Sequence, residues 1–334
     1  MRIEKIDIVK GIGMLCIILS HCFISGTLLH KWLYSFHIPL FFFVSGLFYK
    51  QRSIKELTKT RFNTLIKPYF FFSLASLGLL ILFSFISSSI VLSQQDLIDK
   101  SIGLFYANGY GEWMFNITLW FLPCLFVLES LYNAINRVAL EKYVHIIVVV
   151  AVLLGYLVSK YSALKLPVSI DIAFVALGFY HFGSVAKDFI LKSNSLGVVT
   201  FLITFTLSWY LISYSELVNM SHREYGELLE LYIQGVIGTI MIISLSNIIA
   251  KSSLLSYIGR NSLVILGTHT VIISLFMGIL PKIGISYSSD IEKSIQAFLL
   301  CTFTLPIVIF VLNNKFGYFL GKKEVNRGKC VEWK

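Results

Sequence analysis

Residues 262–280, SLVILGTHTVIISLFMGIL, contain no Asp, Glu, Lys or Arg. As an α-helix this stretch is about 29 Å long, which matches the roughly 30 Å hydrocarbon core of a bilayer. Such a run is typical of a transmembrane helix. Its one ionisable residue is His269, which is flanked by Gly267, Thr268 and Thr270.

Similar apolar runs fill most of the chain. The sequence is 56% hydrophobic and only 14% charged, with a mean hydropathy of +0.78, whereas a soluble domain carries about a quarter charged residues. We therefore predict an all-α polytopic membrane bundle of about ten transmembrane helices, approximately 6–26, 33–49, 68–92, 114–135, 144–160, 169–186, 196–213, 232–250, 262–280 and 294–313. Length favours one transmembrane domain, residues 1–315, followed by a basic cytoplasmic tail, residues 316–334.

The basic residues indicate how these helices are oriented. With the N-terminus inside, about three quarters of the Lys and Arg residues fall in cytoplasmic segments, as the positive-inside rule requires. The opposite side receives only Lys31, Lys100, Lys160, Lys165, Arg223, Lys282 and Lys293. Both termini are thus predicted to be cytoplasmic. Topology also explains the net charge of +10 better than a nucleic acid partner does.

The cysteines do not indicate a metal centre or a disulfide framework. The chain has five, Cys16, Cys22, Cys124, Cys301 and Cys330, without a CxxC pair or other metal-ligand spacing. We expect buried apolar thiols and no metal.

The first predicted span is the richest in ionisable residues, with Asp7, Lys10 and His21. Lys10 and His21 are eleven residues apart, which places them within roughly 20° on one helix face and about 16 Å apart along the axis. Asp7 lies three residues before Lys10 and can pair with it. A functional stripe and an interfacial ion pair with a structural histidine are equally compatible with this pattern.

Two further histidines lie in apolar segments. His37 is in SFHIPLFFFVSG, where Pro39 frees a backbone carbonyl and Gly46 allows close helix approach, so His37 can face His21 across a hairpin. His269 has small polar neighbours that suit a helix interface. For both, a structural or interfacial role is as compatible with the sequence as a catalytic one.

The other ionisable residues in or near spans give weaker signals. We expect Glu129 and Asp171 to be packing or interface partners, and His145 and His181 to be interfacial. His30 and His222 lie in or beside outer loops, with no motif around them.

A basic segment precedes the third span, KQRSIKELTKTRFNTLIKPYFFF at residues 50–72. Its charge is explained by anchoring near anionic lipid. A more specific alternative is that Arg61 and Lys67 form part of a cradle for the phosphates of an anionic donor.

Six short segments, in order along the chain, resemble motifs of the acyltransferase 3 family of membrane O-acyltransferases. Lys10 and His21 in DIVKGIGMLCIILSH are similar to its basic-residue-x10-His motif, and SFHIPLFFFVSG is similar to its FHxPLFFxxSG hairpin. RFNTLIKPYFFF resembles its Arg-containing entry into span three. The remaining three are LWFLPCLF (119–126), DIAFVALGFYHFG (171–183) and IGRNSLVILGTH (258–269). The sugar-modifying branch is the nearest likeness.

The resemblance implies transfer of an acyl group, usually acetyl from acetyl-CoA, to a hydroxyl of a surface or cell-envelope carbohydrate, a polysaccharide or lipid-linked sugar. It also implies a multi-pass protein of a bacterial inner membrane, in contact with membrane lipid. In this scheme Lys10, Arg61 and Lys67 hold the CoA phosphates, and Asp7 orients Lys10. His21 acts as general base or carries the acyl group, with His37 and His269 as assistants.

Three other functions are consistent with a polar-lined bundle. A transporter or flippase of a glycan or lipid-linked sugar would move its substrate without consuming acyl-CoA. An unrelated class of membrane-bound O-acyltransferase would place its key histidine much later in the chain. A non-catalytic scaffold would leave the Lys10–His21 stripe without a purpose.

Overall fold

The structure, a computed structural model, describes residues 3–23, 25–86, 92–108, 116–192, 196–284 and 287–322. The regular elements of these residues are helices, apart from one isolated β-bridge between Asn219 and Glu224. The predicted all-α class is therefore confirmed.

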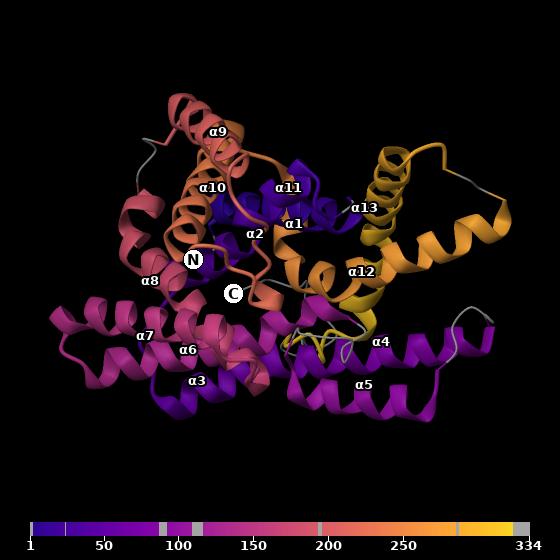
Figure 1. The fold of residues 1–334 in the computed structure, drawn as a ribbon, viewed down its shortest axis with the longest axis horizontal. Coiled ribbons are helices and arrows are strands. Elements are labelled where there is room, and N and C mark those ends of the chain that lie inside the picture. Colours follow the sequence, from indigo (N-terminus) through magenta and orange to yellow (C-terminus); the bar gives the residue numbers. More distant parts are fainter. Residues whose placement is uncertain are drawn as a thin grey trace, which may run out of the picture.

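Seven helical stretches in the described residues are long and apolar enough to cross a membrane, so the chain is a multi-pass membrane protein. They contain α4 (Lys67–Ile86), α6 (Phe121–Val138), α7 (Glu141–Tyr161), α8 (Ile170–Lys192), α10 (Leu228–Ile249), α12 (Ser262–Ile279) and α13 (Asp290–Lys315). Figure 1 shows α6 and α7 on one side of the molecule and α12 and α13 on the other.

The other three predicted spans are also helical but fall outside this group. They are α1 (Glu4–Cys22), α2 (Leu28–Leu47) and α9 (Val198–Ile212). The first carries Glu4, Lys5, Asp7, Lys10 and His21, the second carries His30, Lys31 and His37, and α9 has only 15 residues. The count of ten spans and the cytoplasmic termini thus stay predictions. The ends of three predicted spans, at residues 24, 87–91 and 114–115, lie outside the described residues.

Four helical elements occur between the predicted spans. They are α3 (Ile54–Arg61), a π-helical turn (Phe62–Ile66), α5 (Gln94–Tyr106) and α11 (Ser253–Arg260). The first two run directly into α4. Short 3-10 turns occupy Ile117–Trp120, Pro167–Ser169, Met220–His222 and Leu280–Ile283. α13 ends at Lys315, and residues 316–322 turn back onto α4, where Phe319 stacks on Phe71. The rest of the predicted tail, 323–334, lies outside the described residues.

Helix α1 occupies the centre of the bundle, in contact with α2, α10, α11, α12 and α13. Its packing against α11 depends on two glycines. A Cβ at Gly11 would overlap the backbone carbonyl of Leu255, and a Cβ at Gly259 would overlap that of Asp7. Small residues let helix backbones approach closely inside a membrane, and this approach buries Asp7 of α1.

Large apolar side chains remain exposed on the outer helices. On α13, Phe303, Ile307 and Phe310 are 75%, 66% and 67% exposed. A soluble monomer does not carry such a continuous apolar surface. These side chains are suited to contact with lipid, whereas Asp7, His37 and His269 of α1, α2 and α12 are buried.

Candidate active site

Two cavities adjoin one another along α1. One, which we call the histidine cavity, has a volume of about 210 Å³ and is lined by Ile17, His21, Tyr34, His37, Ile38, Ile117, Thr118, Trp120, Asn219, Met220, Ser221, His222 and Leu266. The other, the lysine cavity, has about 190 Å³ and is lined by Lys10, Met14, Ile17, Ile38, Phe41, Ser45, Thr64, Leu65, Phe121, Leu122, Leu125, Ser262, Leu263 and Leu266. Ile17, Ile38 and Leu266 line both, so they form the boundary between the two spaces.

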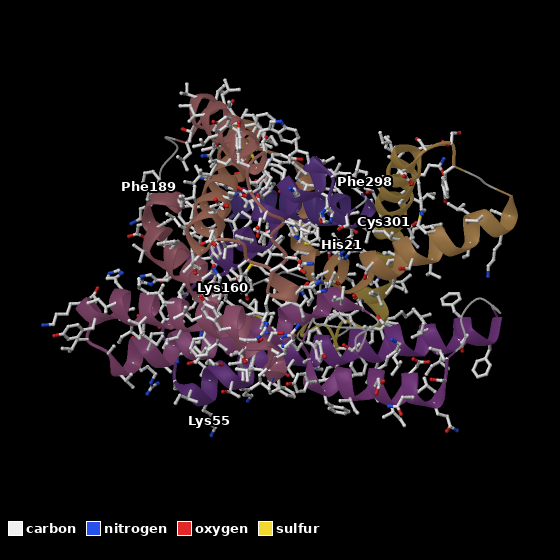
Figure 2. All side chains as sticks on the ribbon, viewed as in Figure 1. His21, Lys55, Lys160, Phe189, Phe298 and Cys301 are labelled. Carbon is white, nitrogen blue, oxygen red and sulfur yellow. The ribbon has the colours of Figure 1, made fainter. Side chains whose placement is uncertain are left out.

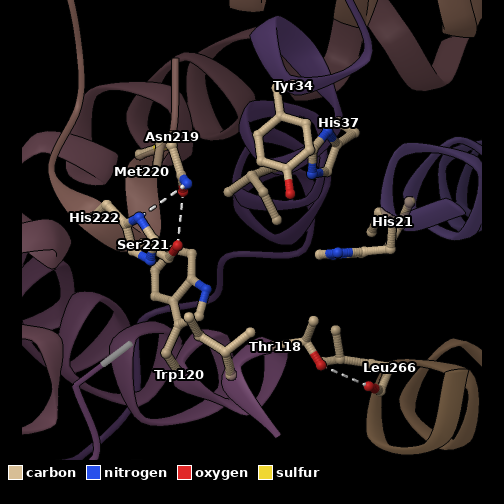
Figure 3. Close-up of a pocket in the computed structure, with 13 residues that line it drawn as sticks. His21, Tyr34, His37, Thr118, Trp120, Asn219, Met220, Ser221, His222 and Leu266 are labelled. Atoms are coloured by element: carbon tan, nitrogen blue, oxygen red, sulfur yellow. Dashed lines mark hydrogen bonds between the residues drawn. The ribbon is translucent and has the colours of Figure 1, made fainter. Parts of the chain in front are cut away.

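His21 sits at the centre of the protein (Figure 2), and its imidazole points into the histidine cavity (Figure 3). Its ring centroid lies 5.2 Å from that of His269 and 6.1 Å from that of Tyr34. Tyr34 is in turn 4.8 Å from His37. The structure thus brings together the three predicted histidines, which come from α1, α2 and α12.

Backbone carbonyls orient two of these imidazoles. His37 Nδ1 donates a hydrogen bond to the carbonyl oxygen of Leu33 at 2.6 Å, and His269 Nδ1 donates to that of Ile265 at 2.8 Å. A carbonyl oxygen can only accept, so each Nδ1 carries a proton and each neutral ring keeps its lone pair on Nε2. Nε2 of His269 is buried with no hydrogen-bond partner in the described structure. It is available to accept a hydrogen bond from a neighbouring group.

A buried asparagine fixes the wall that faces His21. Asn116 donates to the carbonyl oxygen of Gly267 at 2.8 Å and accepts from the hydroxyls of Thr118 and Thr270. These bonds tie residues 116–120 to the helix that carries His269. They hold Trp120 against the cavity.

The lysine cavity has a cation at one end and the shared apolar boundary at the other. Lys10 Nζ lies 3.5 Å from the carboxylate of Asp7, as the i, i+3 spacing predicts. The other polar side chains in the lining are Ser45, Thr64 and Ser262. The predicted Lys10–His21 stripe therefore runs from one cavity to the next.

Arg61 and Lys67 flank the π-helical turn that supplies Thr64 and Leu65 to the lysine cavity, but neither is in its lining. The guanidinium of Arg61 forms a salt bridge with the buried carboxylate of Glu129. Lys67 Nζ lies 3.0 Å from the ring centroid of Tyr318. Their role toward a donor stays a prediction.

Protein partners are also found for Asp171, His145 and His181. Arg223 lies 3.2 Å from Asp171, and both side chains are almost fully buried. His145 and His181 share a hydrogen bond of 2.8 Å, and the hydroxyl of Tyr132 lies 2.9 Å from the other nitrogen of His181. The partner role expected for Glu129 and Asp171 agrees with these contacts.

Sequence reasoning missed several residues of the histidine cavity. Tyr34 directly precedes the motif SFHIPLFFFVSG, and Trp120 lies within LWFLPCLF. Both positions were signals that could have been used. Asn219, Ser221 and His222 come from the loop between α9 and α10, which has no apolar periodicity and no recognisable motif. Only the folded chain places them opposite His21.

The site thus consists of one cavity lined by the imidazole of His21 and an adjoining cavity lined by the cation of Lys10. Comparison with known protein families gives a match to the acyltransferase 3 model, described as an acyltransferase domain, over residues 3–313. Neither a curated protein nor a solved structure matches the chain. The match covers nearly the whole sequence and includes Lys10, His21, His37 and His269. The chain belongs to the acyltransferase 3 family and is a membrane acyltransferase that uses an acyl donor.

Proposed function

We propose that this enzyme transfers an acetyl group from acetyl-CoA to a hydroxyl of a surface or cell-envelope carbohydrate, as a multi-pass protein of a bacterial inner membrane. The observation that carries the proposal is the common boundary of the two cavities. It links a cation that suits an anionic donor to an imidazole that suits proton transfer.

The lysine cavity is the proposed path of the donor. CoA carries phosphates on a long, thin pantetheine arm, and an ammonium group at one end of a narrow cavity attracts such an anion. Lys10, oriented by Asp7, is the first contact, and Arg61 and Lys67 add positive charge around the turn that borders the cavity. The arm then passes Ile17, Ile38 and Leu266, and this places the thioester beside His21.

His21 is the proposed general base. Its imidazole takes the proton of the acceptor hydroxyl while that oxygen attacks the thioester carbonyl carbon. The C–S bond then breaks, the CoA thiolate leaves, and the protonated imidazole returns the proton to the sulfur, so that the ester and free CoA are the products. Nε2 of His269 accepts a hydrogen bond from the protonated His21, and this interaction stabilises the charge that forms there.

Other polar groups assist this step. The hydroxyl of Tyr34 points into the same space as the His21 imidazole (Figure 3). It is a donor that can reach the oxyanion of the tetrahedral intermediate. His37, which packs against Tyr34, fixes the position of that ring.

The proposal is tested on the purified full-length chain in detergent or in lipid vesicles. The acceptor is the host surface glycan from which esters have been removed by mild alkali, and acetyl-CoA is the donor. We expect release of CoA thiol together with a gain of one acetyl mass per modified repeat. Movement of glycan across vesicles without consumption of acetyl-CoA would instead support the transporter alternative.

A further inference from the structure

The loop between α9 and α10 is built as a fixed wall of the histidine cavity. Asn219 and Glu224 exchange backbone hydrogen bonds of 2.7 and 3.0 Å, which close a short hairpin around the 3-10 turn Met220–His222. Val218, Met220 and Tyr225 are buried, with 3%, 3% and 4% exposure. A loop with such anchors holds a defined shape, as a binding wall requires.

The tip of this hairpin faces His21 across the cavity (Figure 3). Ser221 Oγ donates to Asn219 Oδ1 at 2.7 Å, and the Asn219 amide nitrogen lies 3.3 Å from His222 Nδ1. The three side chains thereby support one another at the edge of the space that His21 enters.

One arginine locks the hairpin to its neighbours. Arg223, directly after the cavity residue His222, has a φ of +63°. Its guanidinium donates to the carbonyl oxygens of Ser162 and Leu164 at 2.7 and 2.8 Å and pairs with Asp171. Arg223 itself is not in the cavity lining, so any influence on a ligand there is exerted through the position of the hairpin.

Burial is substantial at this junction. The side chains of Arg223 and Asp171 are only 6% and 0% exposed. The contact of Arg223 with Asp171 is therefore shielded from water, and a shielded ion pair resists rearrangement more than an exposed one.

The chemistry of the lining indicates what the wall receives. Among the described residues that line the histidine cavity there is no Asp, Glu, Lys or Arg. They offer instead the rings of Tyr34 and Trp120 and the neutral polar groups of Thr118, Asn219 and Ser221. Aromatic rings cover the C–H face of a sugar, and neutral groups bond its hydroxyls, but a buried carboxylate or phosphate requires a paired cation.

We propose that the hairpin Val218–Tyr225 is the acceptor-binding wall, that it receives a neutral sugar ring between Asn219, Ser221 and His222 on one side and His21 on the other, and that Arg223 is its positioning residue. This inference rests on the proposed acetyl transfer. It assigns the acceptor to a different part of the chain from the donor, and the two affinities are therefore separable.

The first experiment varies the concentration of the de-esterified host glycan at saturating acetyl-CoA. For His222→Ala and Asn219→Ala we expect the acceptor KM to rise about 2- to 10-fold, the loss of one or two hydrogen bonds, with the acetyl-CoA KM unchanged. Arg223→Ala should raise the acceptor KM similarly, and Arg223→Lys should restore it in part, because lysine keeps the charge but not the planar fork.

Lys160→Ala is the matched control. Lys160 pairs with Glu227 at the other end of the same loop, where both side chains are substantially exposed, and we expect a change in acceptor KM of less than about twofold. Acceptor KM values within twofold of wild type for both His222→Ala and Asn219→Ala would overturn the proposed wall. An equal rise of the donor KM and the acceptor KM in these variants would overturn the assignment of donor and acceptor to different parts of the chain. If Arg223→Ala fails to fold, His222→Ala and Asn219→Ala decide whether the hairpin binds the acceptor.

The second experiment locates the new ester on the glycan by two-dimensional NMR. We expect it on a neutral hexose, deoxyhexose or N-acetylhexosamine. An ester on a uronic acid or a phosphate-bearing ring would overturn the inference that the acceptor sugar is neutral. A wild-type enzyme that transfers no acetyl at all would instead contradict the proposed function, since it would leave no product to map.

Discussion

Two regions of the bundle bury polar side chains in opposite ways. Around α1, α2 and α12, Lys10 and His21 line cavities, and Nε2 of His269 has no hydrogen-bond partner in the described structure. Around α6, α7 and α8, the buried histidine is paired with other side chains: both ring nitrogens of His181 have partners. Glu129 is paired with Arg61.

This difference shows how a catalytic group is recognised in a membrane bundle. An ionisable residue inside an apolar helix is expensive wherever it lies, so its presence alone does not distinguish chemistry from structure. A side chain with all its hydrogen bonds made by the protein is committed to the fold. A side chain that lines a cavity, as His21 does, is available to a substrate.

The largest expected effect separates the two histidine groups. His21→Ala should lower kcat by about 10²–10⁴-fold, the usual contribution of a general base, because the acceptor hydroxyl loses its proton acceptor. His181→Ala removes an imidazole of the same size from the paired region and should change kcat by less than about threefold, with any loss appearing in stability. The measurement is the initial rate of CoA thiol release with the de-esterified glycan as acceptor. Equal losses of kcat in two well-folded variants would remove the distinction between the regions.

The second effect tests whether Arg61 stabilises the folded protein or binds the acyl donor. Arg61→Ala leaves the buried Glu129 carboxylate without its partner, which costs about 3–5 kcal/mol of stability. The double variant Arg61→Ala/Glu129→Ala should recover part of this loss, since the uncompensated charge is gone. Thermal unfolding in detergent measures both.

If Arg61 is also part of the phosphate cradle, the restabilised double variant should still show a raised acetyl-CoA KM. A normal donor saturation curve for that variant would assign Arg61 to the fold alone.

The smallest effect concerns the lysine cavity. Lys10→Ala should raise the acetyl-CoA KM about tenfold, because one charge-assisted contact with a phosphate is lost, and Lys10→Arg should restore most of it. The acceptor KM should stay unchanged. Donor saturation curves of the purified variants provide the check, and a Lys10→Ala curve that overlays the wild type would exclude Lys10 from donor binding.

The sequence alone determined the class of the fold and its membership in a family. Apolar runs of about twenty residues specify membrane helices because the bilayer leaves the backbone no other way to satisfy its hydrogen bonds. The spacing of Asp7, Lys10 and His21 on α1 followed from the 3.6-residue period. The resemblance at six motifs was confirmed by the family match over residues 3–313.

Only the tertiary structure decided which polar groups share a space. His21 and His269 are nearly 250 residues apart in sequence, and their rings meet because glycines let α1 pack closely against α11, which leads directly into α12. The wall opposite them comes from an irregular loop held by Arg223, and Arg61 was found to be paired with Glu129. Helical periodicity fixes the direction of a side chain on its own helix, but the partners it meets depend on how close the helices approach, and that distance is set by contacts between distant residues.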